Sequence, residues 1–482
     1  MKIGRGLVPL PILCYNNAIT KKEDATMQQD KELLGKAPIG RLLFKLALPT
    51  VVAQLVNMLY NVVDRIYIGH IEGYGDLALT GVGVCLPLIM IVSAFAALVG
   101  SGGAPRASIA MGERDYEKAE RILGGCFGLQ LIVSVILTAV LLVWHKPLLL
   151  AFGASENTIL YATEYMRIYA IGTLFVQLTL GMNAFISAQG FTRASMLSVI
   201  IGAVCNIVLD PLFIYGFGLG VRGAAIATVL SQAASTVWIL LFLFGKQTHL
   251  KLRPQYMLPT PRIVLPCVAL GLASFVMQSS ESVIAICFNT SLRTYGGDIA
   301  VGAMTILTSV MQFAMLPMQG VAQGAQPILS YNYGAKQADR VKQAYRLLLI
   351  TCVIYSVVLW ILVMLFPKLF VGMFTDQPAL ADFATPMLRI YYAGMLLFGI
   401  QIACQMTFVS LGQALCSVVV AVTRKFVLLL PLIYLVPHFV EDPTTGVYLA
   451  EPIADIIAVT FTAILFAFVF KRAMTQIEKE AV

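Results

Sequence analysis

Charged side chains are scarce in this sequence. Asp, Glu, Lys and Arg make up only 12% of its 482 residues, whereas 59% are hydrophobic and the mean hydropathy is +0.84. Soluble domains have about 25% charged residues, so this chain has too few charges to cover the surfaces of several water-soluble domains. The composition argues against a soluble enzyme or a nucleic-acid-binding protein, and it predicts a polytopic membrane protein.

The motifs of common catalytic and nucleotide sites are also missing. The nine cysteines form no CxxC pair, so neither a disulfide framework nor a thiolate metal site is expected, and the four histidines form no HExxH. No GxSxG occurs, and Gly35-Lys36 and Gly245-Lys246 lack the Ser or Thr that follows the lysine of a phosphate-binding loop. We therefore expect no enzymatic activity, no cofactor and no direct coupling to ATP.

Long apolar runs predict an all-α membrane fold with twelve transmembrane helices, since about 20 apolar residues cross a bilayer. An even number of spans places both termini on one side, and a polar N-terminal segment without a cleavage site reads as a tail and not as a signal peptide. Assigning Lys and Arg to the loops gives 26 on the terminal side and 7 on the other, with Arg424 and Lys425 counted in the loop between the tenth and eleventh spans. The positive-inside rule then predicts cytoplasmic termini. The runs fall near residues 42–68, 78–104, 121–143, 159–187, 195–215, 223–244, 263–292, 298–325, 345–366, 387–411, 415–437 and 447–470.

The two halves of the chain resemble each other at an offset of 222 residues. Gly102-Gly103-Ala104-Pro105 matches Gly324-Ala325-Gln326-Pro327, Arg167-Ile168-Tyr169 matches Arg389-Ile390-Tyr391, and Gly190 matches Gly412. Six spans per half make this a parallel repeat, and it predicts two pseudo-symmetric six-helix lobes around a central cavity. The predicted parts are a tail at 1–40, an N-lobe at 41–245, a linker at 246–262, a C-lobe at 263–470 and a tail at 471–482.

Acidic residues inside apolar spans are functional candidates, because a charge there is costly. Asp64 ends a stripe on the first span, with Gln54, Asn57 and Asn61 at a 3-4-3 spacing that places all four on one helical face. Such a stripe faces protein or water and not lipid. A structural hydrogen-bonded stripe, or an ion pair between Asp64 and Arg65, is the alternative.

A second acid lies on the fifth span at a depth similar to that of Asp64. Asn206 and Asp210 are four residues apart there, and Thr228 on the sixth span reaches the same depth. Two carboxylates, an amide and a hydroxyl supply hard oxygen ligands that suit Na⁺ or a shared proton. We expect these four residues to form one cation site in the outer half of the N-lobe.

Together these pieces resemble the MATE family of multidrug and toxic compound extrusion transporters over residues 40 to 470. The resemblance rests on Pro49 with the following Asp64-Arg65-Ile66-Tyr67-Ile68-Gly69-His70, on Ala188-Gln189-Gly190, on Asn206-Ile207-Val208-Leu209-Asp210-Pro211, and on Gly223-Ala224-Ala225-Ile226-Ala227-Thr228. The Asn-x-x-x-Asp-Pro form is similar to that of the branch with MepA-like bacterial pumps.

The resemblance implies a cation-coupled antiporter that exports organic cations and amphipathic drugs. It implies a coupling site of Asp64, Asn206, Asp210 and Thr228 with Tyr165, for which Tyr161 and Tyr169 compete. Another branch of the family uses an acid on the seventh span and an Asp on the tenth. Glu281 fits the first, but the predicted tenth span, 387–411, has no acid.

The predicted cargo is a small organic cation, because the interior charges assigned to the spans are mostly acidic.

Pro49 is expected to loosen the first span, because proline lacks an N–H group. Glu451 and Asp455, four residues apart on the last span, could instead be a structural pair satisfied by Tyr or Ser hydroxyls. The alternative function is a lipid-linked flippase or an oligosaccharide translocase of a related superfamily, and Arg or Lys in the cavity would indicate a flippase for anionic head groups. We further expect a monomer in a bacterial plasma membrane that contacts lipid and binds no nucleic acid. The predicted cavity residues are Gln54, Asn57, Asn61, Asn183, Glu281, Glu451 and Asp455.

Overall fold

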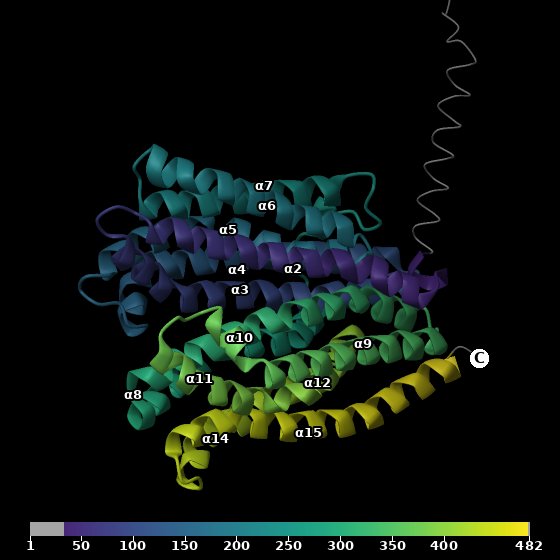
Figure 1. Ribbon diagram of the computed structural model, residues 1–482. Helices are drawn as coiled ribbons and strands as arrows, with labels where there is room; N and C mark the ends of the chain where they lie inside the picture. Colours follow the sequence, from purple (N-terminus) through teal and green to yellow (C-terminus); the bar gives the residue numbers. More distant parts are fainter. Residues whose placement is uncertain (1–32, 481–482) are drawn as a thin grey trace, which may run out of the picture.

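The computed structural model describes residues 33–480, so the predicted N-terminal tail lies mostly outside the described residues. The described chain is almost entirely helical, and its long helices lie side by side in two groups (Figure 1). The first group contains α2 (Ile39–Gly69), α3 (Gly75–Gly112), α4 (Tyr116–Ala151), α5 (Ile159–Ala188), α6 (Thr192–Pro211), η1 (Leu212–Gly216) and α7 (Val221–Phe244). The second contains α8 (Pro261–Gly334), α9 (Ala338–Leu365), α10 (Pro367–Gly372), α11 (Pro378–Tyr391), η3 (Tyr392–Gly394), α12 (Met395–Ser410), α13 (Ala414–Val422), η4 (Thr423–Leu429), α14 (Leu430–Leu435), η5 (Val436–His438) and α15 (Pro443–Glu480), after the short η2 (Pro254–Tyr256).

Helix α8 accounts for two of the predicted spans. Its 74 residues would reach about 110 Å at 1.5 Å per residue, far more than the ~30 Å of a hydrocarbon core. Gly297 interrupts it with φ 65° and ψ −160°, a conformation that only glycine adopts easily. Eleven helical segments of the described chain are long and apolar enough to cross a membrane, and dividing α8 at Gly297 gives the expected twelve.

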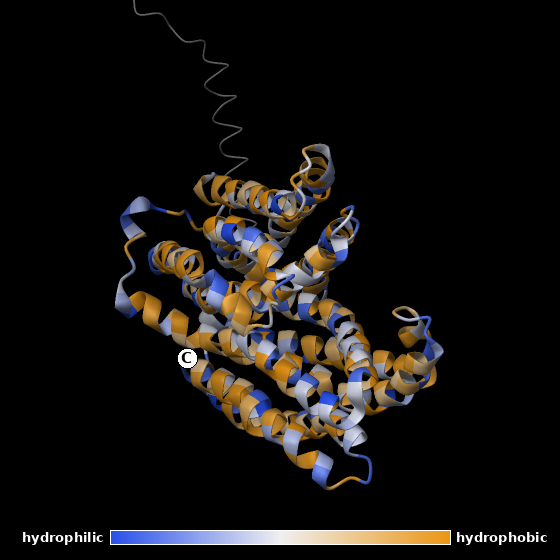
Figure 2. Ribbon diagram, turned by 90° about the vertical axis from the view of Figure 1, so that its left-hand side faces the viewer, coloured by the Kyte–Doolittle hydropathy of each residue, from blue (hydrophilic) through white to orange (hydrophobic). Residues whose placement is uncertain are grey.

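Several helices continue past the predicted ends of the spans. Helix α3 runs to Gly112, the second part of α8 runs to Gly334, and α15 runs to Glu480, so the predicted tail from residue 471 is helical as far as it is described. Apolar residues dominate the middle of the helices, whereas polar residues gather in the loops and near the helix ends (Figure 2). The polar ends of these helices therefore continue the helical structure beyond the apolar part of the molecule.

The eleventh span contains a correction to the loop assignment. It runs from Ala414 to His438 as a continuous helical segment, and Arg424 and Lys425 lie within it, ten and eleven residues after its start. Both side chains are buried, at 7% and 4% exposure. Their placement in a cytoplasmic loop is wrong, and without them the Lys and Arg distribution becomes 24 to 7.

The backbone repeats at the offset found in the sequence. Arg114 and Lys336 are the two non-glycine residues of the described chain with positive φ, at 62° and 56°, and they are 222 positions apart. Gly190 and Gly412 share the same offset and also have positive φ, at 91° and 70°. Such backbone conformations are uncommon, so their recurrence reflects the same loop geometry in both halves.

The stretch between the halves packs on the first group of helices. Leu250 and Leu252 are buried, and the Gln189 side-chain oxygen accepts hydrogen bonds from the Thr248 hydroxyl and from the backbone N–H groups of His249 and Leu250, at 2.8–2.9 Å. These contacts fasten residues 248–252 to the end of α5. Residues 248–252 of the linker are therefore packed on the N-lobe.

The two lobes meet closely at one end. The Thr50 hydroxyl donates to the Gly320 carbonyl at 2.6 Å, and the Gln54 amide donates to the Gln323 side-chain oxygen at 3.0 Å. At the same end, Asn332 and Arg340 of the second half bond to the backbone carbonyl of Leu34, before α2. Figure 1 shows the start of α2 and the C-terminus at this end. The lobes therefore close on each other at the end that carries the described chain ends.

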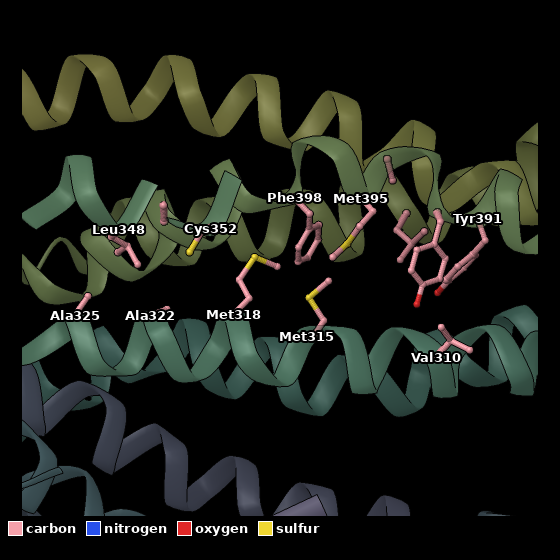
Figure 3. Packing of buried hydrophobic residues seen from close by; sticks show 14 of the residues in the cluster. Val310, Met315, Met318, Ala322, Ala325, Leu348, Cys352, Tyr391, Met395 and Phe398 are labelled. Atoms are coloured by element: carbon pink, nitrogen blue, oxygen red, sulfur yellow. The ribbon is translucent and has the colours of Figure 1, made fainter. Parts of the chain in front are cut away.

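Methionines fill much of the core of the second lobe. Met315 and Met318 on α8 point toward Met395 and Phe398 on α12, and all four are buried (Figure 3). Because methionine is unbranched and flexible, it fills irregular gaps between helices that cross without a regular seam. The packing places α11 and α12 against the part of α8 that carries the candidate site of this lobe.

Candidate ion and substrate sites

Helix α6 supplies the first pair of candidate residues. Asn206 and Asp210 lie one turn apart, and the Asn206 amide donates to the Asp210 carboxylate at 3.0 Å. Their side chains are almost fully buried, at 1% and 0% exposure. Pro211 follows at once, and the next five residues form the π-helical turn η1, a local form that often occurs at functional sites.

Asp64 on α2 meets this pair. The Asp64 carboxyl lies within hydrogen-bonding reach of the Asp210 carboxyl, and two carboxyl groups can share such a bond only when a proton lies between them. One oxygen each of Asp64, Asn206 and Asp210 is buried without a donor partner. The site thus combines acids in close contact with oxygens that are free to accept a proton or to coordinate a cation.

Tyr165 and Thr228 complete the group. Their hydroxyls lie within reach of each other, and the Thr228 hydroxyl donates to the carbonyl of Ala224 at 3.0 Å. Of the competing tyrosines, Tyr161 stacks on Tyr74 with ring centroids 5.1 Å apart, and Tyr169 stacks on Tyr165. The structure therefore brings together all five residues of the predicted coupling site, while Arg65 beside Asp64 is exposed.

The polar stripe on α2 divides into two parts. Gln54 binds Gln323 across the lobes, whereas Asn57 and Asn61 are exposed beyond this contact, with the Asn61 amide bonded to the Asn57 carbonyl. Because Gln54 shares a helical face with both asparagines, that face of α2 looks toward the second lobe. Asn183 does not join this group, since its amide binds Ser195 and Ser198 at the start of α6.

The three acids of the second lobe are paired with bases. The Arg424 guanidinium donates to Asp455 at 2.8 Å and to Glu451 at 3.1 Å, and Lys425 donates to Glu281 at 2.7 Å. Arg424 also lies over the Phe398 ring, 4.8 Å from its centroid. The interior charges of this lobe are thus three acids and two bases, so acids remain the majority, and the two bases were not expected. The alternative in which Tyr or Ser hydroxyls satisfy Glu451 and Asp455 is wrong, because Arg424 binds both carboxylates.

Local helix geometry presents these two bases. Arg424 and Lys425 belong to η4, a seven-residue π-helical segment on the helix that corresponds to α6 in the repeat. Gly394, in the 3-10 turn between α11 and α12, is needed beside it, because a Cβ there would lie 2.9 Å from the Asp455 Cβ. The helical segment of the tenth span does contain one acid, Asp382, but that residue is exposed near its start.

A cavity of about 140 Å³ adjoins this cluster. The two residues of the Glu281–Lys425 ion pair both line this cavity, but their exposure differs. The Glu281 side chain is 51% exposed, whereas that of Lys425 is only 5% exposed. Apolar and hydroxyl groups complete the wall. The lining residues include Ile284, Phe288, Asn289, Met304, Thr305, Thr308, Tyr391 and Glu451.

Sequence reasoning missed Arg424, Lys425 and Gln323. A signal for the two bases was present, because both lie inside an apolar run of 25 residues with similar lengths on either side. A base in the middle of a span is costly, so it indicates an interior partner. Gln323 offered no such signal, because a single amide near a glycine-rich helix end is common.

Two repeated six-helix lobes that carry buried ionisable clusters define a membrane transporter and not an enzyme. Comparison with known proteins gives the family. The MatE family profile matches residues 49–212 and again 273–435, more than half of the chain. The chain therefore belongs to the MatE family and is a multi-pass membrane protein.

Individual relatives agree with this membership. The multidrug export protein MepA of Staphylococcus haemolyticus is 24% identical over 440 residues, which cover 91% of this chain and 96% of that protein. A structure described as the outward-facing conformation of a multidrug resistance MATE family transporter of the MOP superfamily has a TM-score of 0.85 at 25% identity, and covers 92% of this chain and 98% of its own. A MOP superfamily transporter from Pyrococcus furiosus, described as having a binding pocket of reverse polarity, has a TM-score of 0.85 at 24% identity and the same coverages.

Proposed function

We propose that the protein is a secondary active multidrug efflux transporter, which exchanges H⁺ or Na⁺ for organic cations and amphipathic drugs across a bacterial plasma membrane. The observation that carries this proposal is the contact between Asp64 and Asp210, together with the donorless oxygens around it. The export function of the staphylococcal relatives supports the direction of transport.

The coupling step follows from the chemistry of the acid pair. With one proton between them, Asp64 and Asp210 hold one negative charge fewer than two separate carboxylates. Removing that proton leaves two like charges in contact, which costs free energy unless a cation replaces it or the helices move apart. Asn206 and Thr228 would supply the further oxygen ligands for Na⁺. Binding and release of the ion would thus change the preferred distance between α2 and α6.

The described conformation suits the outward-open state of such a cycle. The lobes meet at the end of the chain termini, while Asn57, Asn61 and Glu281 are exposed toward the other end. With both termini in the cytoplasm, as the Lys and Arg distribution favours, that other end faces outward. An ion from outside would then approach the acid pair through Asp64, which is less buried than Asp210.

Everted membrane vesicles test the proposal. Ethidium transport is measured after applying a pH gradient or a Na⁺ gradient separately, for the wild type, Asp64→Asn and Asp210→Asn. We expect one gradient to drive transport by the wild type and both variants to lose at least about 90% of it, because neither amide can exchange a proton. Glu72→Gln, in the exposed loop after α2, is the matched control and should transport normally. Gradient-driven transport by both Asn variants at the wild-type rate would refute the coupling site.

A flippase for anionic lipid-linked substrates is a second candidate, since the second lobe does contain an interior Arg and Lys. Both bases are paired with acids, however, and the cluster of three acids and two bases is not cationic. The vesicle assay distinguishes the two functions, because a flippase moves a labelled anionic lipid between leaflets and leaves ethidium transport at the background of empty vesicles.

A further inference from the structure

The ion-pair cluster of the second lobe lacks one positive charge. Glu281, Glu451 and Asp455 provide three acids, whereas Arg424 and Lys425 provide two bases. Four of these five side chains are less than 10% exposed. Because uncompensated charge is costly in a medium of low dielectric constant, one more monovalent cation would complete the cluster.

The exposed member of the cluster is the place where that cation can arrive. Glu281 is half exposed at the cavity, and its partner Lys425 lies buried behind it. The cavity, at about 140 Å³, is smaller than the ~300–1,000 Å³ of pockets for drug-sized ligands. It therefore fits the charged head of a cargo molecule, with the rest of the molecule outside the cavity.

Lys425 has a second acid within reach when a cargo cation takes Glu281. Glu451 lines the same cavity and lies within electrostatic range of Lys425. Arg424 holds Glu451 with one nitrogen and Asp455 with another. An exchange of Lys425 from Glu281 toward Glu451 would leave each acid with a cationic partner, and the three acids would then face three cations.

We propose that this cluster selects cargo with a single positive charge, and that Lys425 is the residue that limits the number of positive charges the cluster accepts. The inference rests on the proposed export of organic cations and adds the number of charges to it. Lys425 acts as a cation tethered to the protein, and it occupies part of the acidic charge that a dication would otherwise use.

Binding of two dyes to the purified full-length protein in lipid nanodiscs tests the proposal. Ethidium and propidium share one ring system but carry one and two positive charges, and fluorescence titration gives the Kd of each. For the wild type we expect tighter binding of ethidium. For Lys425→Gln, which leaves an excess of two negative charges, the preference should shift toward propidium by about tenfold or more. Lys425→Arg keeps the charge and should keep the wild-type preference.

A double variant separates charge counting from loss of a contact. Lys425→Gln combined with Glu281→Gln leaves two acids and one base, and so restores an excess of one negative charge. We expect weaker binding of both dyes but a return of the preference for ethidium. Lys246→Gln, at an exposed position two residues after α7, is the control for removal of a lysine and should change nothing.

The dye-binding experiment distinguishes a failure of charge selection from a failure of the proposed coupled export. An unchanged ratio of the two dissociation constants in Lys425→Gln overturns the inference, even where gradient-driven ethidium transport is intact. A shift toward propidium that persists in the double variant also overturns it, because the charge count would then not matter. Absence of gradient-driven transport in the wild type, with the dye ratios as expected, would instead refute the coupled export and leave the charge selection standing.

Discussion

Arg424 compensates the charge of two buried carboxylates on α15. Its guanidinium contacts both Glu451 and Asp455 and lies over Phe398, so one residue joins three neighbouring segments. We expect Arg424→Met to lower the free energy of unfolding by about 3–5 kcal/mol, because removing one partner leaves buried charge without compensation. Thermal unfolding in detergent measures this. Arg472→Met, on an exposed part of α15, is the matched control, and equal melting temperatures for the two variants would contradict the argument.

At the level of single residues, the first lobe was easier to predict than the second. Asp64 and Asp210 interrupt apolar runs as isolated acids, and the 3.6-residue period places their neighbours on one face. Arg424 and Lys425 interrupt an apolar run in the same way, but two adjacent bases also match what cytoplasmic loops contain. The loop assignment hid the partners of Glu281, Glu451 and Asp455, and the cluster therefore looked acidic.

Helix α2 passes through Pro49 without a break. Proline has no N–H group, so the carbonyl one turn earlier loses its usual donor and the helix bends there more easily. We expect Pro49→Ala to slow transport several-fold while the Kd for ethidium changes less than about twofold, because the change stiffens a moving helix and leaves the binding residues in place. Initial transport rates and equilibrium titration measure the two effects. Pro147→Ala, exposed near the end of α4, serves as the control; equal rates for all three proteins would exclude a role for the bend.

The start of α15 depends on a capping residue outside the span. The Asp442 carboxylate accepts from the Thr445 hydroxyl at 2.6 Å and from the backbone N–H groups of Thr444 and Thr445 at 3.1 Å. These hydrogen bonds, that from the Thr445 hydroxyl first, lower the pKa of Asp442. A lowered pKa stabilises the fold above the pKa of the unfolded chain, near 3.9, and this contribution disappears as the pH falls through the lower folded value.

Asp442→Ala should therefore lower stability at neutral pH by about 0.5–2 kcal/mol, the usual range for loss of a helix cap. Asp442→Asn should retain most of the cap at pH 7, because an amide oxygen also accepts hydrogen bonds. Melting temperatures at pH 7 and near pH 3.5 measure the difference, which should shrink on acidification. A difference between wild type and Asp442→Ala that grows as the pH falls would have the wrong sign.

For whole elements, composition predicted the number of spans but not their full lengths. Apolar runs mark only the part of a helix that crosses the hydrocarbon core, so α3, α8 and α15 continue into polar sequence that hydropathy assigns to loops. The merging of the seventh and eighth spans across Gly297 was also hidden, since a polar Gly-Gly-Asp turn reads as a loop. The twelve spans and the repeat could be predicted because both depend on patterns that extend over many residues.

The closed end of the molecule depends on glycines at the surface between the lobes. A Cβ at Gly324 would lie 2.4 Å from the Ala47 Cα, and a Cβ at Gly112 would lie 2.1 Å from the Tyr331 carbonyl oxygen. Both contacts are with backbone, so the neighbouring side chains cannot relieve them by rotating. Close approach of helices through small residues is the usual way in which membrane helices pack, and here the same residues join parts that must separate when the transporter opens to the other side.

Gly324→Ala should accordingly disfavour the described conformation, in which the lobes touch at this end. We expect ethidium transport in vesicles to fall about tenfold, because the cycle would lose one of its two end states. Hydrogen exchange of residues 43–54 on α2 and 98–112 on α3 should rise as this end opens. Gly302→Ala lies on the same helix, where a Cβ would meet only the Leu380 side chain at an ordinary 3.5 Å, and it should behave like the wild type in both measurements. If Gly324→Ala transports normally and its exchange pattern is unchanged, the lobes do not need this close contact, and the remaining contacts at this end, among them the Gln54–Gln323 and Thr50–Gly320 hydrogen bonds, suffice to hold it closed.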